Sequence, residues 1–169
     1  MLHRQLLEQA RHLARRERGR PRQASLRRAV STAYYALFHL LAHEVSRQLL
    51  RGQRGAGLRP LLGRALAHSD MKAASRSFAG GTLPAVVQDF AASQPSPELR
   101  RVAKAFVLLQ EQRHAADYDL RRRFGRREAL TIVSEAEAAF RAWAAARGRA
   151  EALLFLVCLL TWKPLMGRS

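Results

Sequence analysis

The chain has 169 residues, 48% of them hydrophobic, and its 30 basic and 13 acidic residues give a formal charge of +17. This length is one domain's worth and suffices for a hydrophobic core without disulfides, and a single cysteine, Cys158, excludes an internal disulfide framework. The N-terminal stretch carries arginines and no apolar run, so we expect no secretory signal and a cytoplasmic protein.

The basic excess is almost entirely arginine, since only three of the basic residues are lysine. A GC-rich genome explains arginine in place of lysine, but it does not explain the scarcity of acids. Because neutralising phosphates releases counterions, the excess favours RNA or DNA over a membrane surface as the partner. The alternatives are a chain that is simply basic and one that binds an acidic protein.

The first half of the chain follows a helical period. Residues 2–18 form an amphipathic stripe. A second helix is predicted over 25–50, with Ser25 as its cap, and the glycine-rich residues 51–57 break it. A shorter helix is predicted near 58–68.

The second half continues in the same way. Residues 79–81 open a loop, and Thr82 begins another short helix. Ser96, followed by a proline, has the pattern of an N-cap, and its helix is predicted to run to about Arg123. The last large helix covers about 127–147. Because no segment alternates convincingly at period two, the predicted fold class is all-α.

The apolar run ALLFLVCLLTW at 152–162 is the one segment that suggests a membrane. As a helix it rises only about 16 Å, whereas the hydrocarbon core of a bilayer is about 30 Å thick. We therefore expect a terminal helix that packs on the core or on a second subunit, and we expect no membrane partner. An exposed membrane-surface contact or partner interface is the alternative.

One polar stripe borders the apolar faces of the second helix. At steps of four, three, four and four it contains Arg28, Thr32, Tyr35, His39 and His43. Because the helix is apolar on most sides, these groups need partners inside the fold. A later helix offers one, since Arg113 lies in line with its apolar face and Asp117 follows one turn on. The alternative is an Arg113–Asp117 pair that only holds the packing.

The segments RRAVSTAYYALFHLL at 27–41 and RHAADYDL at 113–120 resemble the HEPN superfamily (higher eukaryotes and prokaryotes nucleotide-binding). The likeness is to a bacterial branch that pairs a Tyr-Tyr helix with an ADY helix. HSDMKAASRSF at 68–78 resembles that branch as well, and the likeness spans roughly residues 25–140.

The resemblance implies an up-and-down bundle of four or five main helices over residues 1–147. The apolar segment 148–169 would then pack on the bundle or on a dimer partner. Many HEPN proteins form homodimers and are metal-independent ribonucleases of toxin–antitoxin, abortive-infection or CRISPR systems. Others bind nucleotides or act as partners of small nucleotidyltransferases.

The family's ribonuclease motif is an arginine followed, after four to six residues, by a histidine. Arg113 corresponds to that arginine, but Tyr118 stands where the earliest histidine would fall, and none of the six histidines has the required spacing. If the chain is catalytic, Arg113 stabilises phosphate charge, His39 is the candidate proton shuttle, and Asp117 and Tyr118 orient the site. The alternative for His39 is a core histidine bonded to a carbonyl or to Asp117.

No metal or other cofactor is expected. His39 and His43 have the spacing of helical zinc ligands, but Leu40 stands where a zincin has glutamate and no third ligand is evident.

A basic cluster lies where the Arg113 helix ends and the last helix begins. Cations favour a helix C-terminus, but five arginines exceed that need, so a phosphate-binding rim is predicted. Base stacking of single strands is not expected from this cluster. The predicted binding residues are Arg28, Tyr35, Arg121, Arg122, Arg123, Arg126 and Arg127.

The sequence therefore predicts an RNA- or nucleotide-binding protein of a bacterial defence or toxin–antitoxin system, with ribonuclease activity as one version. The alternative is a non-catalytic helical module that pairs with an antitoxin, a nucleotidyltransferase or another protein.

Overall fold

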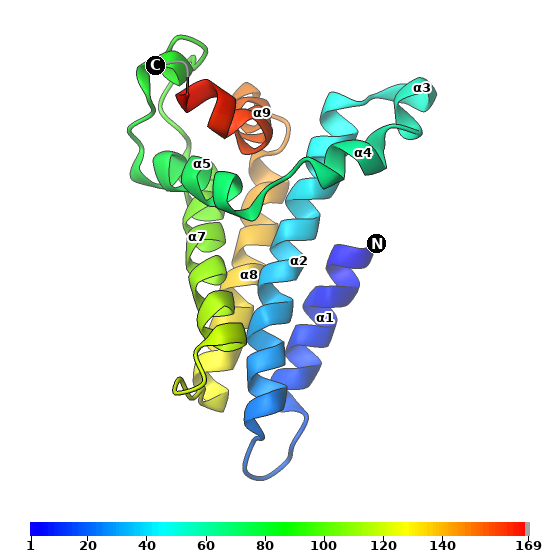
Figure 1. Ribbon diagram of the computed structural model, residues 1–169, viewed down its shortest axis with the longest axis vertical. Helices are drawn as coiled ribbons and strands as arrows, with labels where there is room; N and C mark the ends of the chain where they lie inside the picture. Colours follow the sequence, from blue (N-terminus) through cyan, green and yellow to red (C-terminus); the bar gives the residue numbers. More distant parts are fainter. Residues whose placement is uncertain (168–169) are drawn as a thin grey trace. The chain divides into compact units, whose positions relative to one another are not determined.

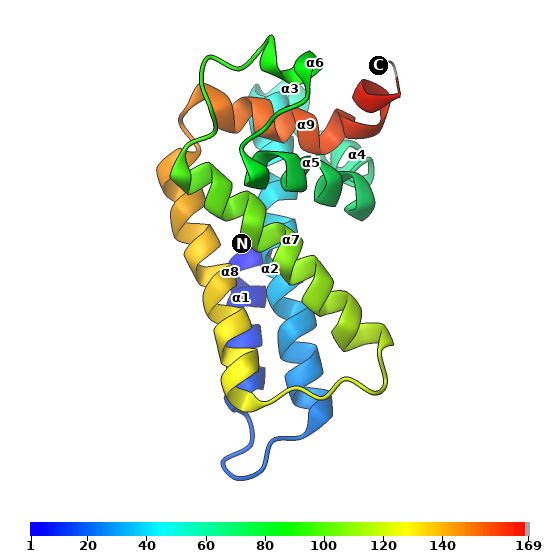
Figure 2. The ribbon, with the colours of Figure 1, turned by 90° about the vertical axis from the view of Figure 1, so that its left-hand side faces the viewer.

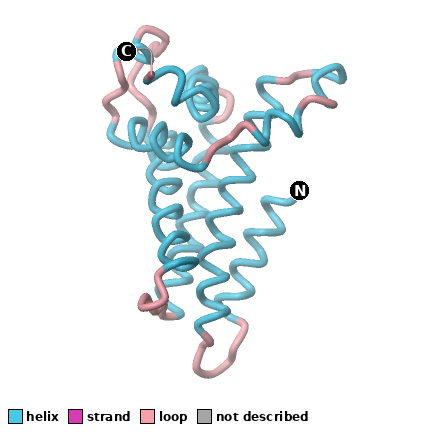
Figure 3. The backbone as a smooth tube through the Cα atoms, in the orientation of Figure 1, coloured by secondary structure: helices cyan, strands magenta, loops and turns pink. Residues whose placement is uncertain are grey.

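The computed structural model describes residues 1–167 of the chain, without the side chain of Arg54 (Figure 1). Every regular element in that range is a helix, so the protein is an all-α helical bundle, as predicted (Figure 3). The helices in chain order are α1 (Leu2–Arg15), α2 (Gln23–Leu49), α3 (Gly52–Ala56), α4 (Arg59–Arg64), α5 (His68–Gly80), α6 (Ala85–Gln88), α7 (Pro97–Tyr118), α8 (Arg126–Ala146) and α9 (Ala150–Met166).

The chain forms two compact units. Unit 1 consists of Met1–Leu40 and Ala105–Arg141, and unit 2 consists of Leu41–Lys104 and the chain from Ala142 onward. The boundary therefore falls within three long helices, α2, α7 and α8, each of which contributes one part to each unit.

The core of unit 1 is built around the first part of α2. Val30, Tyr34 and Leu37 are completely buried, as the helical period predicted. Ala33, on the neighbouring small-residue stripe, is completely buried as well. The ring of Tyr34 packs on Phe106 of α7, with 5.6 Å between the ring centroids. This packing sets the α2 side chains beside Tyr34 against the second part of α7.

The start of α2 differs from the prediction, because Ser25 is not its cap. The helix begins at Gln23, and the N–H of Leu26 already bonds to the carbonyl of Arg22 at 3.2 Å. Ser25 lies inside the first turn and donates its hydroxyl to Glu17 at 2.6 Å. The hydroxyl is therefore used by a carboxylate of the preceding loop rather than by a backbone N–H of its own helix.

The start of α7 agrees with the prediction and its end does not. Ser96 caps the helix through a bond from the N–H of Leu99 to its hydroxyl oxygen at 3.3 Å. The helix stops at Tyr118 rather than near Arg123. The Asp119 carboxylate accepts the N–H groups of Arg121 and Arg122 at 2.9 and 3.2 Å, which replaces the helical pattern with a turn.

Other predicted boundaries are also wrong. The first helix ends at Arg15 rather than near residue 18, the helix predicted near 58–68 covers only Arg59–Arg64, and the loop predicted from residue 79 begins later because α5 runs over His68–Gly80.

The stretch 51–57 contains the short helix α3 rather than only a break. The short helix predicted from Thr82 begins at Ala85 instead. Pro84 takes the N-cap position in an extended conformation, and a proline disfavours helical geometry at the residue before it, here Leu83.

Unit 2 is built on α5 and α9, which lie side by side (Figures 1 and 2). The rings of Phe78 and Phe155 meet edge to face at 4.9 Å, and Leu156 is also buried. The predicted segment 148–169 thus contains α9, while its last two residues lie outside the described part of the chain. None of the described helices combines the length and the apolar character needed to cross a membrane.

Candidate functional site

Part of the predicted site converges in unit 1 around Arg113 of α7, where Tyr35, Asp117 and Tyr118 contact its guanidinium. Its Nε lies 2.8 Å from the Asp117 carboxylate, and its Nη2 donates to the Tyr35 hydroxyl of α2 at 3.0 Å. Ser31 of α2 donates to the same Asp117 oxygen at 3.3 Å. The side chains of Arg113 and Asp117 are only 18% and 26% exposed, so the ion pair is partly shielded from water. The predicted pairing of α2 with this part of α7 is therefore observed.

Aromatic rings surround the Arg113 guanidinium. Its central carbon lies 5.5 Å from the ring centroid of Tyr118 and 6.0 Å from that of Tyr34. Burial alone would lower the pKa of Arg113, but Tyr35, Asp117 and Tyr118 outweigh burial and hold that pKa above its ordinary value. Arg113 is therefore a permanent cation held in one orientation.

Tyr34 and Tyr118 differ in exposure, and therefore in whether a ligand could contact them. Tyr34 is completely buried, and burial raises its pKa well above the ordinary value, so it stays neutral and belongs to the core. Tyr118 is 63% exposed, and its ring lies 5.0 Å from that of His114. An exposed aromatic residue thus stands beside the arginines that follow α7, although the sequence did not indicate base stacking.

His39 is not in bonding contact with Arg113 or Asp117. Its ring lies one turn beyond Tyr35, 6.5 Å from that ring and 5.4 Å from Phe38. Burial lowers the pKa of His39, which favours the neutral imidazole. The Tyr35 hydroxyl occupies the position beside Arg113 where a proton shuttle from α2 was expected.

The most extensively bonded residue of the site, Arg27, was not predicted. It donates to the carbonyls of Ala116 and Asp119 at 2.8 Å each, and to that of Arg122. Its neighbour Arg28, which was predicted to bind nucleic acid, is exposed and takes no part in these bonds. A stripe begun at Arg27 instead of Arg28 would have found it: residues 27, 31 and 35 all contact α7 or the loop after it.

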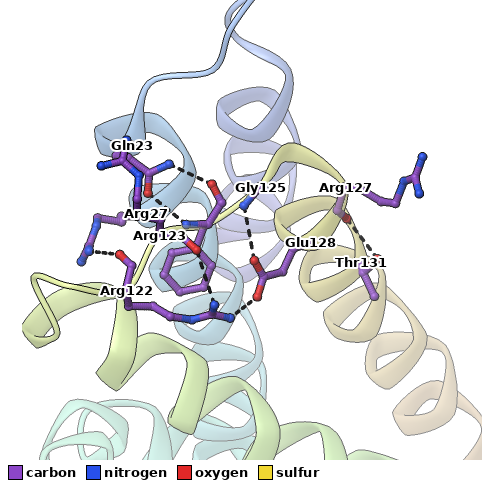
Figure 4. A network of polar contacts seen from close by, with 9 residues as sticks. Gln23, Arg27, Arg122, Arg123, Gly125, Arg127, Glu128 and Thr131 are labelled. Atoms are coloured by element: carbon purple, nitrogen blue, oxygen red, sulfur yellow. Dashed lines mark hydrogen bonds and ion pairs between the residues drawn. The ribbon is translucent and has the colours of Figure 1, made fainter.

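The α7–α8 loop, residues 119–125, is held by further polar contacts (Figure 4). Gln23 and Phe124 exchange two hydrogen bonds at 2.8 and 3.0 Å. Arg122 pairs with Glu128 and its guanidinium lies 4.8 Å from the Phe124 ring. At the start of α8, Arg126 donates to the carbonyls of Glu17 and Gly19. Of the five arginines predicted to form a rim, Arg122 and Arg126 therefore hold the structure together.

The other three arginines, Arg121, Arg123 and Arg127, are all exposed, and we call them the exposed trio. In the described part of the chain their guanidinium groups make no hydrogen bond or ion pair. Figure 4 shows the Arg127 side chain pointing away from the network that surrounds Glu128. Arg121 and Arg123 of the loop, together with Arg127 of α8, thus present positive charge on a backbone that hydrogen bonds already hold in place.

Nothing within residues 1–167 gathers three or more histidine, cysteine, aspartate or glutamate side chains as a metal site would require. No protein-family model, curated protein or solved structure matches the chain.

Proposed function

We propose that the protein binds RNA through the exposed trio, which lies on the α7–α8 loop and the first turn of α8. One observation carries the proposal: Arg122 of the loop and Arg126 at the start of α8 hold the structure together, whereas the trio beside them remains exposed and without side-chain partners in the described chain. A guanidinium presents a planar fork of donors that matches phosphate oxygens.

Two features of the molecule support this function. The loop is bonded to α2 through Gln23 and Arg27, so little backbone freedom would be lost when RNA binds. The formal charge of +17 would draw a polyanion to the surface and release counterions when phosphates are neutralised.

The cellular setting is part of the same proposal. The Tyr34–Tyr35 helix and the RHAADYDL segment support membership of the HEPN superfamily, in a cytoplasmic, homodimeric protein of a bacterial defence or toxin–antitoxin system. Within such a system an antitoxin or a nucleotidyltransferase would be the protein partner. A salt-insensitive protein complex in place of RNA binding would favour the non-catalytic module instead.

The test is RNA affinity in matched triple variants, measured by fluorescence anisotropy with labelled poly-U. We expect the combined change Arg121→Ala, Arg123→Ala and Arg127→Ala to weaken binding about tenfold or more, a loss of at least about 1.4 kcal/mol. The control removes the same charge elsewhere, at the exposed residues Arg47, Arg64 and Arg147. Equal losses in both triple variants would mean that only net charge matters, and the proposed surface would be wrong.

Metal-independent ribonuclease activity is the second candidate, favoured by the preorganised Arg113 cation. Wild-type protein would cleave end-labelled RNA in the presence of a chelator, and a folded Arg113→Ala variant would not. Because His39 is not beside Arg113, the His39→Ala variant tests whether it contributes a proton. Intact RNA with both wild type and Arg113→Ala would exclude this candidate.

A further inference from the structure

A groove in unit 2 is lined by none of the residues discussed so far as RNA contacts. It runs between α9 and the segment that contains α6, with a volume of about 630 Å³. This volume lies within the usual range for small-molecule sites, about 300–1,000 Å³. Its main lining residues are Val87, Phe90, Leu153, Leu154, Val157 and Pro164.

The lining of the groove is almost wholly apolar. Thr161 is its one hydroxyl, and that hydroxyl already donates to the Val157 carbonyl at 2.8 Å. Phe90 and Leu153 are 76% and 41% exposed, so apolar surface remains in contact with water. A hydrocarbon chain that covered this surface would be stabilised by its removal from water.

A second, smaller cavity of about 290 Å³ adjoins the groove. The two share the lining residues Phe90, Ala150 and Leu154, so they are adjacent. The smaller cavity is lined by the segment before α7 and by Arg149 and Glu151. The apolar groove therefore lies next to a polar corner that contains Arg149 and Glu151, and we call the groove and the adjoining cavity together the channel.

The charges of this corner favour a ligand group that donates hydrogen bonds. Arg149 Nη1 lies 3.1 Å from Glu98 and 3.6 Å from Glu151, so two carboxylates share one guanidinium. One Glu151 oxygen accepts the Ser96 N–H at 2.8 Å, and the other accepts no hydrogen bond. The three groups together carry one excess negative charge, which disfavours an anionic head group.

We propose that this channel binds a single-chain amphiphile whose head group is an alcohol or an amine. Its hydrocarbon chain lies along α9 between Val87 and Val157, and its head donates toward Glu151. This site shares no residue with the RNA-binding surface and does not depend on it.

The first test is displacement of the fluorescent apolar probe N-phenyl-1-naphthylamine from the full chain. Dodecylamine, 1-dodecanol and laurate are compared below the concentrations at which they form micelles. We expect the amine and the alcohol to bind at least about tenfold more tightly than laurate. The net charge of +17 by itself favours the anionic laurate, so this order of affinities cannot come from electrostatic attraction to the net charge of the protein. Equal or tighter binding of laurate would overturn the head-group assignment.

Variants then locate the site. Phe90→Gln and Leu153→Gln change exposed side chains that folding tolerates, and each should weaken probe binding about tenfold. Leu61→Gln is the matched control, because Leu61 is 67% exposed and lies outside the groove. Glu151→Gln should reduce the preference for dodecylamine over laurate without changing probe affinity.

Two results would overturn the proposal. One is a wild-type chain that binds no probe, or groove variants that bind it as tightly as Leu61→Gln does. The other is a wild-type dimer that Leu153→Gln dissociates, in which case the groove is a contact between two copies.

Discussion

Arg27 donates a hydrogen bond to the carbonyl of Ala116, 2.8 Å away, in the last turn of α7. The same guanidinium also bonds to the carbonyls of Asp119 and Arg122. One α2 side chain thus satisfies carbonyls that the end of a helix leaves without intrahelical partners. Arg27 also fixes the loop backbone that carries Arg121 and Arg123, two residues of the exposed trio.

We expect Arg27→Met to lower the free energy of unfolding by about 2–4 kcal/mol, because it removes three hydrogen bonds to carbonyls at the end of α7 and in the loop that follows. Arg28→Met is the control next to it, since Arg28 is exposed, and its effect should be within about 0.5 kcal/mol. Urea denaturation measures both. Equal effects would show that the three hydrogen bonds do not hold the end of α7.

Arg113 and Asp117 should be energetically coupled. The pair lies at 2.8 Å and is partly shielded, so a double-mutant cycle with Arg113→Gln and Asp117→Asn should give a coupling of about 0.5–1.5 kcal/mol. Measuring RNA affinity on the same variants separates two roles. If the pair only stabilises helix packing, the variants lose stability but keep their RNA affinity. If the pair belongs to a binding site, the variants lose RNA affinity while they remain folded.

His39 should make the protein less stable in mild acid. Its pKa is lowered in the folded state by burial, so the unfolded chain binds a proton more readily. Its stabilising contribution is complete above its ordinary pKa of 6.5 and falls as the pH drops below that value. We expect His39→Gln to flatten the decline in unfolding free energy between about pH 7 and pH 5. An unchanged slope in urea titrations would contradict this assignment.

Cys158 should react slowly with thiol reagents. It is 1% exposed, and burial raises its pKa to about 11, so little thiolate forms near neutral pH. Alkylation by iodoacetamide should be at least about 100-fold slower than that of the urea-unfolded chain. Comparable rates would show that α9 opens readily.

Helix placement followed from local patterns, because apolar spacing and capping signals act over a few residues. The long helices and the Ser96 cap are where the sequence indicates. The end of α7 could not be predicted in this way, since Asp119 and the distant Arg27 compete with continued helix formation. Ser25 has the pattern of a cap, but its hydroxyl donates a hydrogen bond to Glu17 in the preceding loop, a contact that no helical period reveals.

The candidate site was predictable in part for the same reason. Arg113, Asp117 and Tyr35 converge because each lies on a helical face that must meet a neighbour. Which arginines would be structural was not predictable, since five similar residues lie close together and only their tertiary contacts distinguish them. Arg122 pairs with Glu128, and Arg126 donates to a carbonyl of the loop between α1 and α2. The guanidinium groups of the exposed trio make no hydrogen bond or ion pair in the described chain.

The most direct test of RNA binding by the exposed trio is the salt dependence of the dissociation constant for single-stranded RNA. Each phosphate contact contributes about 0.7 to the slope of log affinity against log salt, so removing all three arginines should reduce the slope by about 2. The Arg47, Arg64 and Arg147 control should keep the wild-type slope. A trio variant with the wild-type slope would show that these arginines do not contact phosphate, and the account would be wrong.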